Sequence, residues 1–435
     1  MKKLLNHIRT HINNYKHLKM AKVLLLIIFI VAGHALNAQQ YPEAYLDDAI
    51  NNNPAINAKL KAYEADLQEI NIARTLPDPQ LAAGIFTPSM SRLMGDQWFD
   101  VEIMQMFPWF GTLNKQKNAA QELSQKSFHE YRLERNTVFM EITTLWLRIY
   151  QKEQQIKLID QFVKNLKAKE DLIYSRYEGG KQKSGLTLDI YRMEIQLAEL
   201  YNRKKKLNED IISLTRSFNI LIKREELSEI ETPASLKNID KTEDSEKIQD
   251  SFENNPGLNM AQSSKEAAKI NRDISKLKTR PMMGIGLKYS YFSEGDPNMG
   301  QMDGGHMIMP MISVSLPIYR SKNQARVQKA ELFANAADYR EEEQLNKLQI
   351  EWTNIQSSLK NLQNDYGFYS EQLEITYKTW DLITAGYASG DEGFDELLRV
   401  QDQLIELEWR ILNTIIEQHI LFAKSDMLQA KNVFK

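Results

Sequence analysis

The sequence predicts a mainly α-helical chain with a membrane β-barrel portion, built from two copies of a helix, strand, strand, helix, helix unit. Three observations lead to this fold class. Residues 112–178 contain neither glycine nor proline, and residues 318–385 contain only Gly367. Four short segments alternate apolar and polar residues, as strands with one buried face do. The same landmarks recur in the same order in both halves of the chain.

The start of the chain has the pattern of an export signal. Basic residues precede the apolar run "VLLLIIFIVA" at 23–32, and small residues follow as far as Ala38. The run is too short to span a bilayer as a helix. We therefore expect residues 1–38 to be a removed signal peptide, with Met1 or Met20 as the start of translation.

The composition of the 435 residues excludes several classes of function. Lys+Arg 55 against Asp+Glu 58 gives a net charge of -3, so no nucleic-acid partner is predicted. Cysteine is absent, which excludes disulfides, thiolate metal sites and a lipidated cysteine. No catalytic or phosphate-binding motif is present, so neither catalytic residues nor a cofactor are predicted. An exported hydrolase with scattered carboxylates stays open but lacks a motif.

The two copies align through shared landmarks. Residues 52–79 match 254–281 without a gap, and both segments begin near an Asn-Asn-Pro sequence. "FPWFG" at 107–111 matches "LPIYR" at 316–320, and the glycine turns "YEGG" and "YASG" follow. The predicted division is a first repeat at 39–219, a charged linker at 220–251 and a second repeat at 252–435.

Each copy predicts the same elements. A helix of about 20 residues begins at the Asn-Asn-Pro signal, where asparagine caps and proline suits the first turn. Two strands follow in each copy, at roughly 80–91 and 97–107 and again at 282–293 and 305–316. Long helices come next, and apolar residues recur along them at alternating threes and fours, as in a coiled coil. Returning helices follow the glycine turns.

Four strands with one apolar face cannot stand alone in lipid, because the backbone groups of open edges would lack hydrogen-bond partners. Other copies of the chain must complete the barrel. Proline ends strand pairing and aromatic residues favour the membrane interface, so Pro108, Trp109 and Pro317 are predicted to mark the barrel boundary. The alternative is that these residues fill a soluble core below the strand ends.

The duplicated order, with "LPDPQL" from Leu76 and "MFPWFG" from Met106, resembles the TolC family of outer-membrane efflux proteins. The sequences of these motifs most resemble those of outer-membrane components of heavy-metal efflux systems of the copper and silver type. The resemblance implies a homotrimer with a twelve-strand barrel in the outer membrane and a twelve-helix tunnel across the periplasm. It also implies a periplasmic adaptor and an inner-membrane pump of the resistance-nodulation-division type as partners, with heavy-metal cations as possible cargo.

In that family the glycine turns lie at the periplasmic tips of the tunnel, where they contact the adaptor and narrow the entrance. The matching positions here are Tyr177, Gly180, Asp189, Tyr387, Gly390 and Glu396. Repeated in three chains, Asp189 and Glu396 are expected to form acidic rings that favour cations. The alternative is that they are solvated carboxylates at helix starts.

Methionines gather around the second strand pair, and thioethers prefer soft ions such as Cu(I). The cluster consists of Met299, Met302, Met307, Met309 and Met311, with His306 beside them, and the candidate ligands within it are Met299, Met302, His306 and Met307. The alternative is that methionine is an adaptable apolar filler there.

A soluble periplasmic coiled-coil scaffold or adaptor is the competing class of function. It shares the heptads and the export signal, but it does not account for four alternating segments arranged as two matched pairs.

Overall fold

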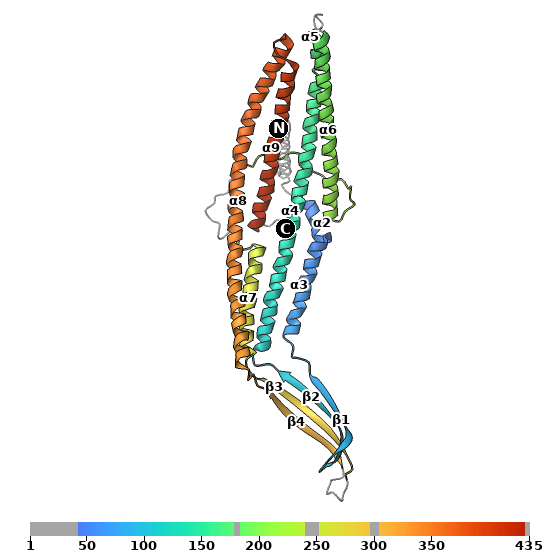
Figure 1. Cartoon of the computed structure of the whole chain (residues 1–435), viewed down its shortest axis with the longest axis vertical. Coiled ribbons are helices and arrows are strands. Elements are labelled where there is room, and N and C mark those ends of the chain that lie inside the picture. The colour runs from blue at the N-terminus through green and yellow to red at the C-terminus, as the bar shows by residue number, and fades with distance from the viewer. Residues whose placement is uncertain (1–41, 178–182, 240–251, 296–303, 431–435) are drawn as a thin grey trace, which may run out of the picture.

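The computed structural model describes residues 42–177, 183–239, 252–295 and 304–430, so the expected signal peptide at 1–38 lies outside the described residues. The molecule is long and narrow, with a sheet at one end and the tips of helical hairpins at the other (Figure 1). The helices are α2 Glu43–Asn52, α3 Pro54–Ala73, α4 Thr112–Lys167, α5 Glu170–Tyr177, α6 Lys183–Leu221, α7 Pro256–Leu277, α8 Arg320–Ser389 and α9 Phe394–Leu428. The strands are β1 Gln80–Arg92, β2 Gly95–Phe107, β3 Met282–Ser293 and β4 Gly305–Ser315.

The four strands begin and end within a few residues of the predicted bounds, and the mainly helical fold class is confirmed. The order α3, β1, β2, α4, α6 recurs as α7, β3, β4, α8, α9. One expected helix differs: the chain from 112 to 178 is interrupted at Ala168 and Lys169, where the Lys169 N–H donates to the carbonyl of Leu166. This tighter turn leaves both Leu166 and Ile173 buried on the same side.

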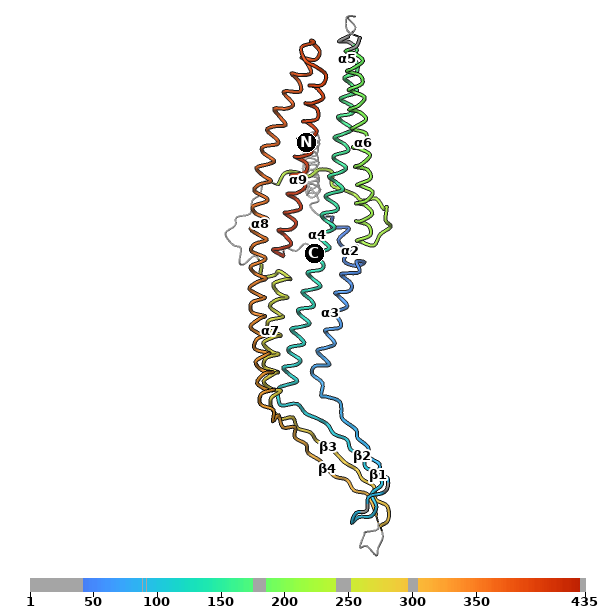
Figure 2. The backbone as a smooth tube through the Cα atoms, in the orientation of Figure 1, coloured from blue at the N-terminus to red at the C-terminus, as the bar shows by residue number. Residues whose placement is uncertain are grey.

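The Asn-Asn-Pro signal performs two tasks in each copy. The Asn53 side chain accepts from the N–H groups of Ala55 and Ile56, which caps α3, and its Nδ2 donates to the last helical carbonyl of α6, at Leu221. Asn255 repeats the arrangement at the start of α7, as described below. Each short helix therefore stacks on the end of a long returning helix, and the backbone trace of α7 takes up the line of α9 (Figure 2).

Asn255 caps α7 through Gly257 N–H at 2.9 Å and donates to the carbonyl of Leu428 at 3.0 Å. Its side chain is buried, so both the N–H groups at the start of α7 and a carbonyl at the end of α9 are satisfied without water. One residue type at one position thus joins two helices end to end.

Apolar seams pack the long helices together, as the heptad spacing predicted. Toward the tips, one core combines residues of both hairpins, including Ile159, Leu200, Leu397 and Leu404. A second core at mid-length contains Ile142, Trp146 and Phe218 among others. These cores hold α4, α6, α8 and α9 in register from mid-length to the tip.

The first two residues of the predicted linker are the last two of α6. Residues 222–239, the rest of its described part, have neither helix nor strand and are called the crossing segment below. Side chains of α4 and α9 hold the crossing segment through contacts with its backbone carbonyls. Trp146 Nε1 donates to the carbonyl of Glu231, and His419 Nε2 lies 3.0 Å from the carbonyl of Lys237. Residues 240–251 lie outside the described residues.

The strands form one antiparallel sheet in the order β1-β2-β3-β4. Strands β2 and β3 come from different halves of the chain, and they pair along most of their length. The sheet therefore joins the two repeats of the chain into one surface.

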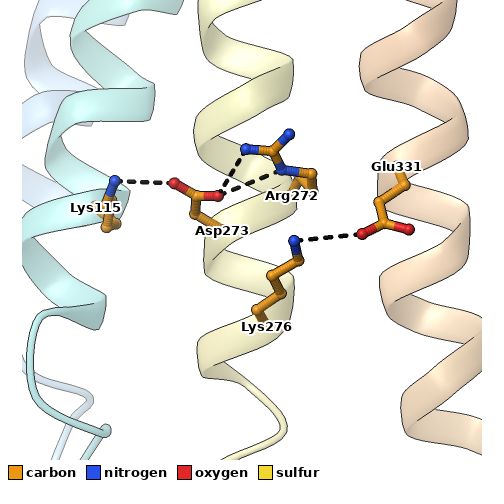
Figure 3. A network of polar contacts seen from close by, with 5 residues as sticks. All are labelled: Lys115, Arg272, Asp273, Lys276 and Glu331. Carbon is orange, nitrogen blue, oxygen red and sulfur yellow. Dashed lines mark hydrogen bonds and ion pairs between the residues drawn. The ribbon is translucent and has the colours of Figure 1, made fainter.

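Charged residues tie α4, α7 and α8 together near the sheet (Figure 3). Lys115 Nζ lies 3.0 Å from Asp273 Oδ2, and Lys276 Nζ lies 3.3 Å from Glu331 Oε1. The hydrogen bond from Lys115 lowers the pKa of Asp273 below its ordinary value, with a further contribution from Arg272. All these side chains are partly exposed, so each pair stabilises the junction only modestly.

Within the described residues, no helix combines the length and the apolar character needed to cross a membrane.

Candidate functional site

The tips of the two hairpins are joined by a buried hydrogen bond. Tyr387, near the end of α8, donates its hydroxyl to Asp189 Oδ2 of α6 at 2.9 Å. The tyrosine is fully buried against Phe394, and Asp189 is 5% exposed. A hydrogen bond to a carboxylate in such surroundings is among the stronger ones in proteins. We call this pair the tip contact.

A partly exposed arginine reinforces the tip contact. Arg192 Nη1 of α6 lies 3.6 Å from Asp189 and 3.3 Å from Asp395 of α9. Sequence reasoning named Asp189 and Tyr387 as separate tip residues, but it identified neither their contact nor the roles of Arg192 and Asp395. The available signal was a basic residue one helical turn after Asp189.

The remaining predicted tip residues have different surroundings. Gly390 ends α8 with φ +94°, a left-handed conformation that a residue with a side chain resists. Glu396 is partly exposed and accepts from Arg399 Nε at 2.9 Å, and this hydrogen bond lowers the pKa of its carboxyl group. Tyr177 is the last residue of α5, whereas Gly180 lies outside the described residues.

One face of the sheet is apolar and exposed. Cross-strand partners share a face. One row on this face consists of Leu81, Ile103 and Leu287, and another contains Ile285 and Ile312. Ile312 is 83% exposed and Leu81 is 71% exposed. The predicted alternation is therefore confirmed. Figure 1 shows the sheet extending beyond the helices, so no described helix covers this face.

The opposite face carries charges, small residues and thioethers. Lys288 Nζ lies 2.6 Å from Asp100 Oδ2, and Glu102 is the direct cross-strand partner of Lys288. This polar face is the less exposed side of β3, where Gly284, Gly286 and Ser290 are buried. The two faces of one sheet thus have opposite chemistry.

The predicted boundary residues lie where strands pass into helices. Pro108 and Trp109 separate β2 from α4, and Pro317 separates β4 from α8. Gly111 begins α4 with φ +81°, which explains the glycine at this turn. Exposed apolar side chains surround the junction, including Phe110, Leu316, Ile318 and Tyr319.

The two predicted metal candidates that the structure describes, His306 and Met307, do not converge. Met299 and Met302 lie outside the described residues. Neighbouring residues of a strand point to opposite faces, so His306 and Met307 do not meet at one ion. His306 lies on the apolar face, where Nδ1 is 2.7 Å from the hydroxyl of Tyr289. Among described residues, no group of three or more histidine, aspartate or glutamate side chains is placed to hold a metal.

Comparison with known proteins identifies solved structures that share this architecture. No family model matches the sequence, and no curated protein matches it either. Solved structures match over almost the whole chain. CusC, described through its folding and transmembrane channel formation, has a TM-score of 0.73 at 14% identity, over 89% of this chain and 91% of that one.

Two further structures have the same fold. The outer membrane protein VceC of Vibrio cholerae has a TM-score of 0.72 at 15% identity, over 90% of this chain and 97% of that one. The open state of the MtrE outer membrane channel of Neisseria gonorrhoeae has a TM-score of 0.69 at 16% identity, over 89% and 88%. CusC and MtrE are described as channels and VceC as an outer membrane protein, so the fold expected from the resemblance of the motifs is confirmed.

Proposed function

We propose that this chain is the outer-membrane exit duct of a tripartite efflux system, which conducts substrates passively and catalyses no reaction. In this proposal three copies form a twelve-strand barrel in the outer membrane and a twelve-helix tunnel in the periplasm. The observation that carries it is the incomplete sheet: four strands with an exposed apolar face and two edge strands, at the end of a helical shaft.

The edges explain why several copies are needed. Within the described residues, β1 and β4 each pair with one strand only. Bilayer hydrocarbon offers no partners for the remaining N–H and C=O groups, so β4 of one copy must pair with β1 of the next. Bacterial membrane barrels of a single chain begin at eight strands, and three copies of this sheet supply twelve.

The apolar face has nearly the height of a membrane band. Phe99 and Phe107 are eight positions apart on β2, about 27 Å along the strand, and a tilt of about 35–45° gives a height of about 19–22 Å, against about 25 Å in known barrels. Aromatic residues lie at both ends. Phe99 stacks on Tyr291 with centroids 5.7 Å apart at the far end, and Trp109 lies at the junction with the helices. This arrangement supports an interfacial role for Pro108, Trp109 and Pro317.

At the other end, the tips are proposed to meet a periplasmic adaptor that links the duct to an inner-membrane pump of the resistance-nodulation-division type. The tip contact holds the two hairpins of one copy together. We assign Asp189 to this contact rather than to an exposed acidic ring, because its carboxylate is buried. Opening of the tunnel entrance then requires the hydrogen bond between Tyr387 and Asp189 to break.

The predicted division into repeats at 39–219 and 252–435, with the linker between them, is kept in this proposal. It is supported by the recurring element order and by the matching asparagine caps. A signal peptide at 1–38 would deliver the chain to the periplasm.

Edge pairing between copies can be tested directly, because the chain contains no cysteine. Ala83 of β1 and Ile308 of β4 lie in one row of the sheet, at its two edges. Closure of a barrel staggers its strands, so Ile308→Cys is combined in turn with a cysteine at successive positions of β1. Each double variant is treated with a bis-maleimide shorter than the about 14 Å between these edges within one sheet. We expect a covalent trimer from purified outer membranes.

The single-cysteine variants serve as matched controls and should yield nothing larger than a dimer. If every double variant of the β1 series stays monomeric, although both cysteines react with a monofunctional maleimide, the barrel is contradicted. A chain recovered entirely in the soluble fraction would instead support the scaffold function.

A further inference from the structure

Methionines from both halves of the chain gather on the polar face of the sheet. Met104 and Met106 lie on β2, and Met311 lies on β4. The register places Met104, Gly286 and Met311 in one row across three strands. Because cross-strand partners share a face, all three methionines are on the face that carries Asp100, Glu102 and Lys288.

The glycines of β3 leave room for the thioethers. A β-carbon at Gly286 would lie 2.7 Å from Met104 Cε and 3.0 Å from its Sδ. At Gly284 it would lie 2.7 Å from Met106 Sδ and 3.1 Å from Met104 Sδ. The two sulfurs therefore both lie over Gly284, where Ser313 Oγ of β4 would lie 2.6 Å from the same β-carbon. Met311 is the β4 partner of the next glycine on this face, Gly286.

This face is a poor place for methionine as a filler. Filler methionines occupy dry gaps inside cores, whereas here the neighbouring rows carry an ion pair and serines. Met309, in the row of Glu102 and Lys288, is 40% exposed. In the proposed barrel, on which this inference depends for its enclosed setting, the face lines the water-filled interior.

We propose that Met104, Met106 and Met311 form a binding site for a soft monovalent cation of the Cu(I) and Ag(I) class. Thioether sulfur selects such ions over hard cations. Glu102 lies two residues before Met104 on the same face, and its carboxylate adds the negative charge that thioethers lack. Three copies would place three such sites around one channel.

Silver nitrate in chloride-free buffer is the probe, and silver bound per chain is measured on the purified trimer by equilibrium dialysis and elemental analysis. The triple variant Met104→Leu, Met106→Leu, Met311→Leu keeps side-chain volume but removes the sulfurs. We expect at least tenfold weaker silver binding than in the wild type. Met283→Leu is the matched control, because Met283 lies on the apolar face of β3.

His306→Ala tests the imidazole of β4, which lies on the opposite face from Met311, and should leave binding unchanged. Equal silver binding by the triple variant and the wild type would overturn the site, as would loss of binding in Met283→Leu. Conductance in planar bilayers is recorded on the same samples. A conducting wild type that binds no silver refutes the site but not the duct, whereas a protein that forms no pore refutes the duct.

Discussion

Replacing Tyr387 with phenylalanine removes a single hydroxyl from the tip contact. The ring still packs against Phe394, so the change isolates the hydrogen bond to Asp189. Hydrogen bonds to charged groups contribute about 1.5–3 kcal/mol when one partner is removed. No reduction for solvent screening is needed, because the tyrosine is fully buried.

This energy sets the size of the expected effect on opening. A loss of about 2 kcal/mol changes an equilibrium constant about 30-fold. The ratio of closed to open state in each protomer should therefore fall by about that factor. Arg192 still offsets part of the charge of Asp189 from 3.6 Å. We expect a higher open probability in planar bilayers.

Spin labels at the exposed positions Tyr191 of α6 and Leu382 of α8 report the separation of the hairpins without relying on conduction. The distance distribution should lengthen or broaden in Tyr387→Phe. Tyr377→Phe is the matched control, since Tyr377 donates to Glu408 at 2.8 Å but joins the two helices of one hairpin. Identical distances and currents in wild type, Tyr387→Phe and Tyr377→Phe would refute the tip contact as a restraint.

Three further predictions test the joints of the fold by thermal unfolding of the purified protein. Asn255→Ala removes the α7 cap and the partner of the Leu428 carbonyl together, and should lower stability by about 2–3 kcal/mol; an unchanged melting temperature would contradict the joint. Burial lowers the pKa of His419 in the folded protein. The contribution of the neutral imidazole to the free energy of unfolding is therefore present above about pH 6.5 and is lost as pH falls through the lowered folded pKa. His419→Gln should therefore flatten the fall in melting temperature between about pH 7.5 and 5, and equal slopes would contradict this. Gly286→Ala should cost about 1–3 kcal/mol through overpacking, whereas Gly367→Ala in α8 has free space and should stabilise by up to about 1 kcal/mol; the reverse order would contradict the close packing over β3.

The sequence alone located most of the elements. Alternation of period two is a local property, and it placed all four strands and the apolar face that carries Ile285 and Ile312. The Asn-Asn-Pro signals placed the starts of α3 and α7, because capping depends on neighbouring residues only. The break after Lys167 was missed, since neither glycine nor proline marks it.

Contacts between distant residues were decided by the tertiary structure. Asp189 and Tyr387 are 198 positions apart, and nothing local indicates that they meet. The methionines illustrate the same limit. Closeness in sequence grouped His306 with Met307, although strand geometry places them on opposite faces, whereas Met104 and Met311 share one row across β3.

The sequence by itself therefore determined the helices, the strands and the opposite chemistry of the two sheet faces, because each follows from the spacing of neighbouring residues. Only the tertiary structure decided that β2 pairs with β3, which hairpins touch at the tip, and which sulfurs share one row. Such contacts depend on where whole elements pack, and no local pattern encodes that.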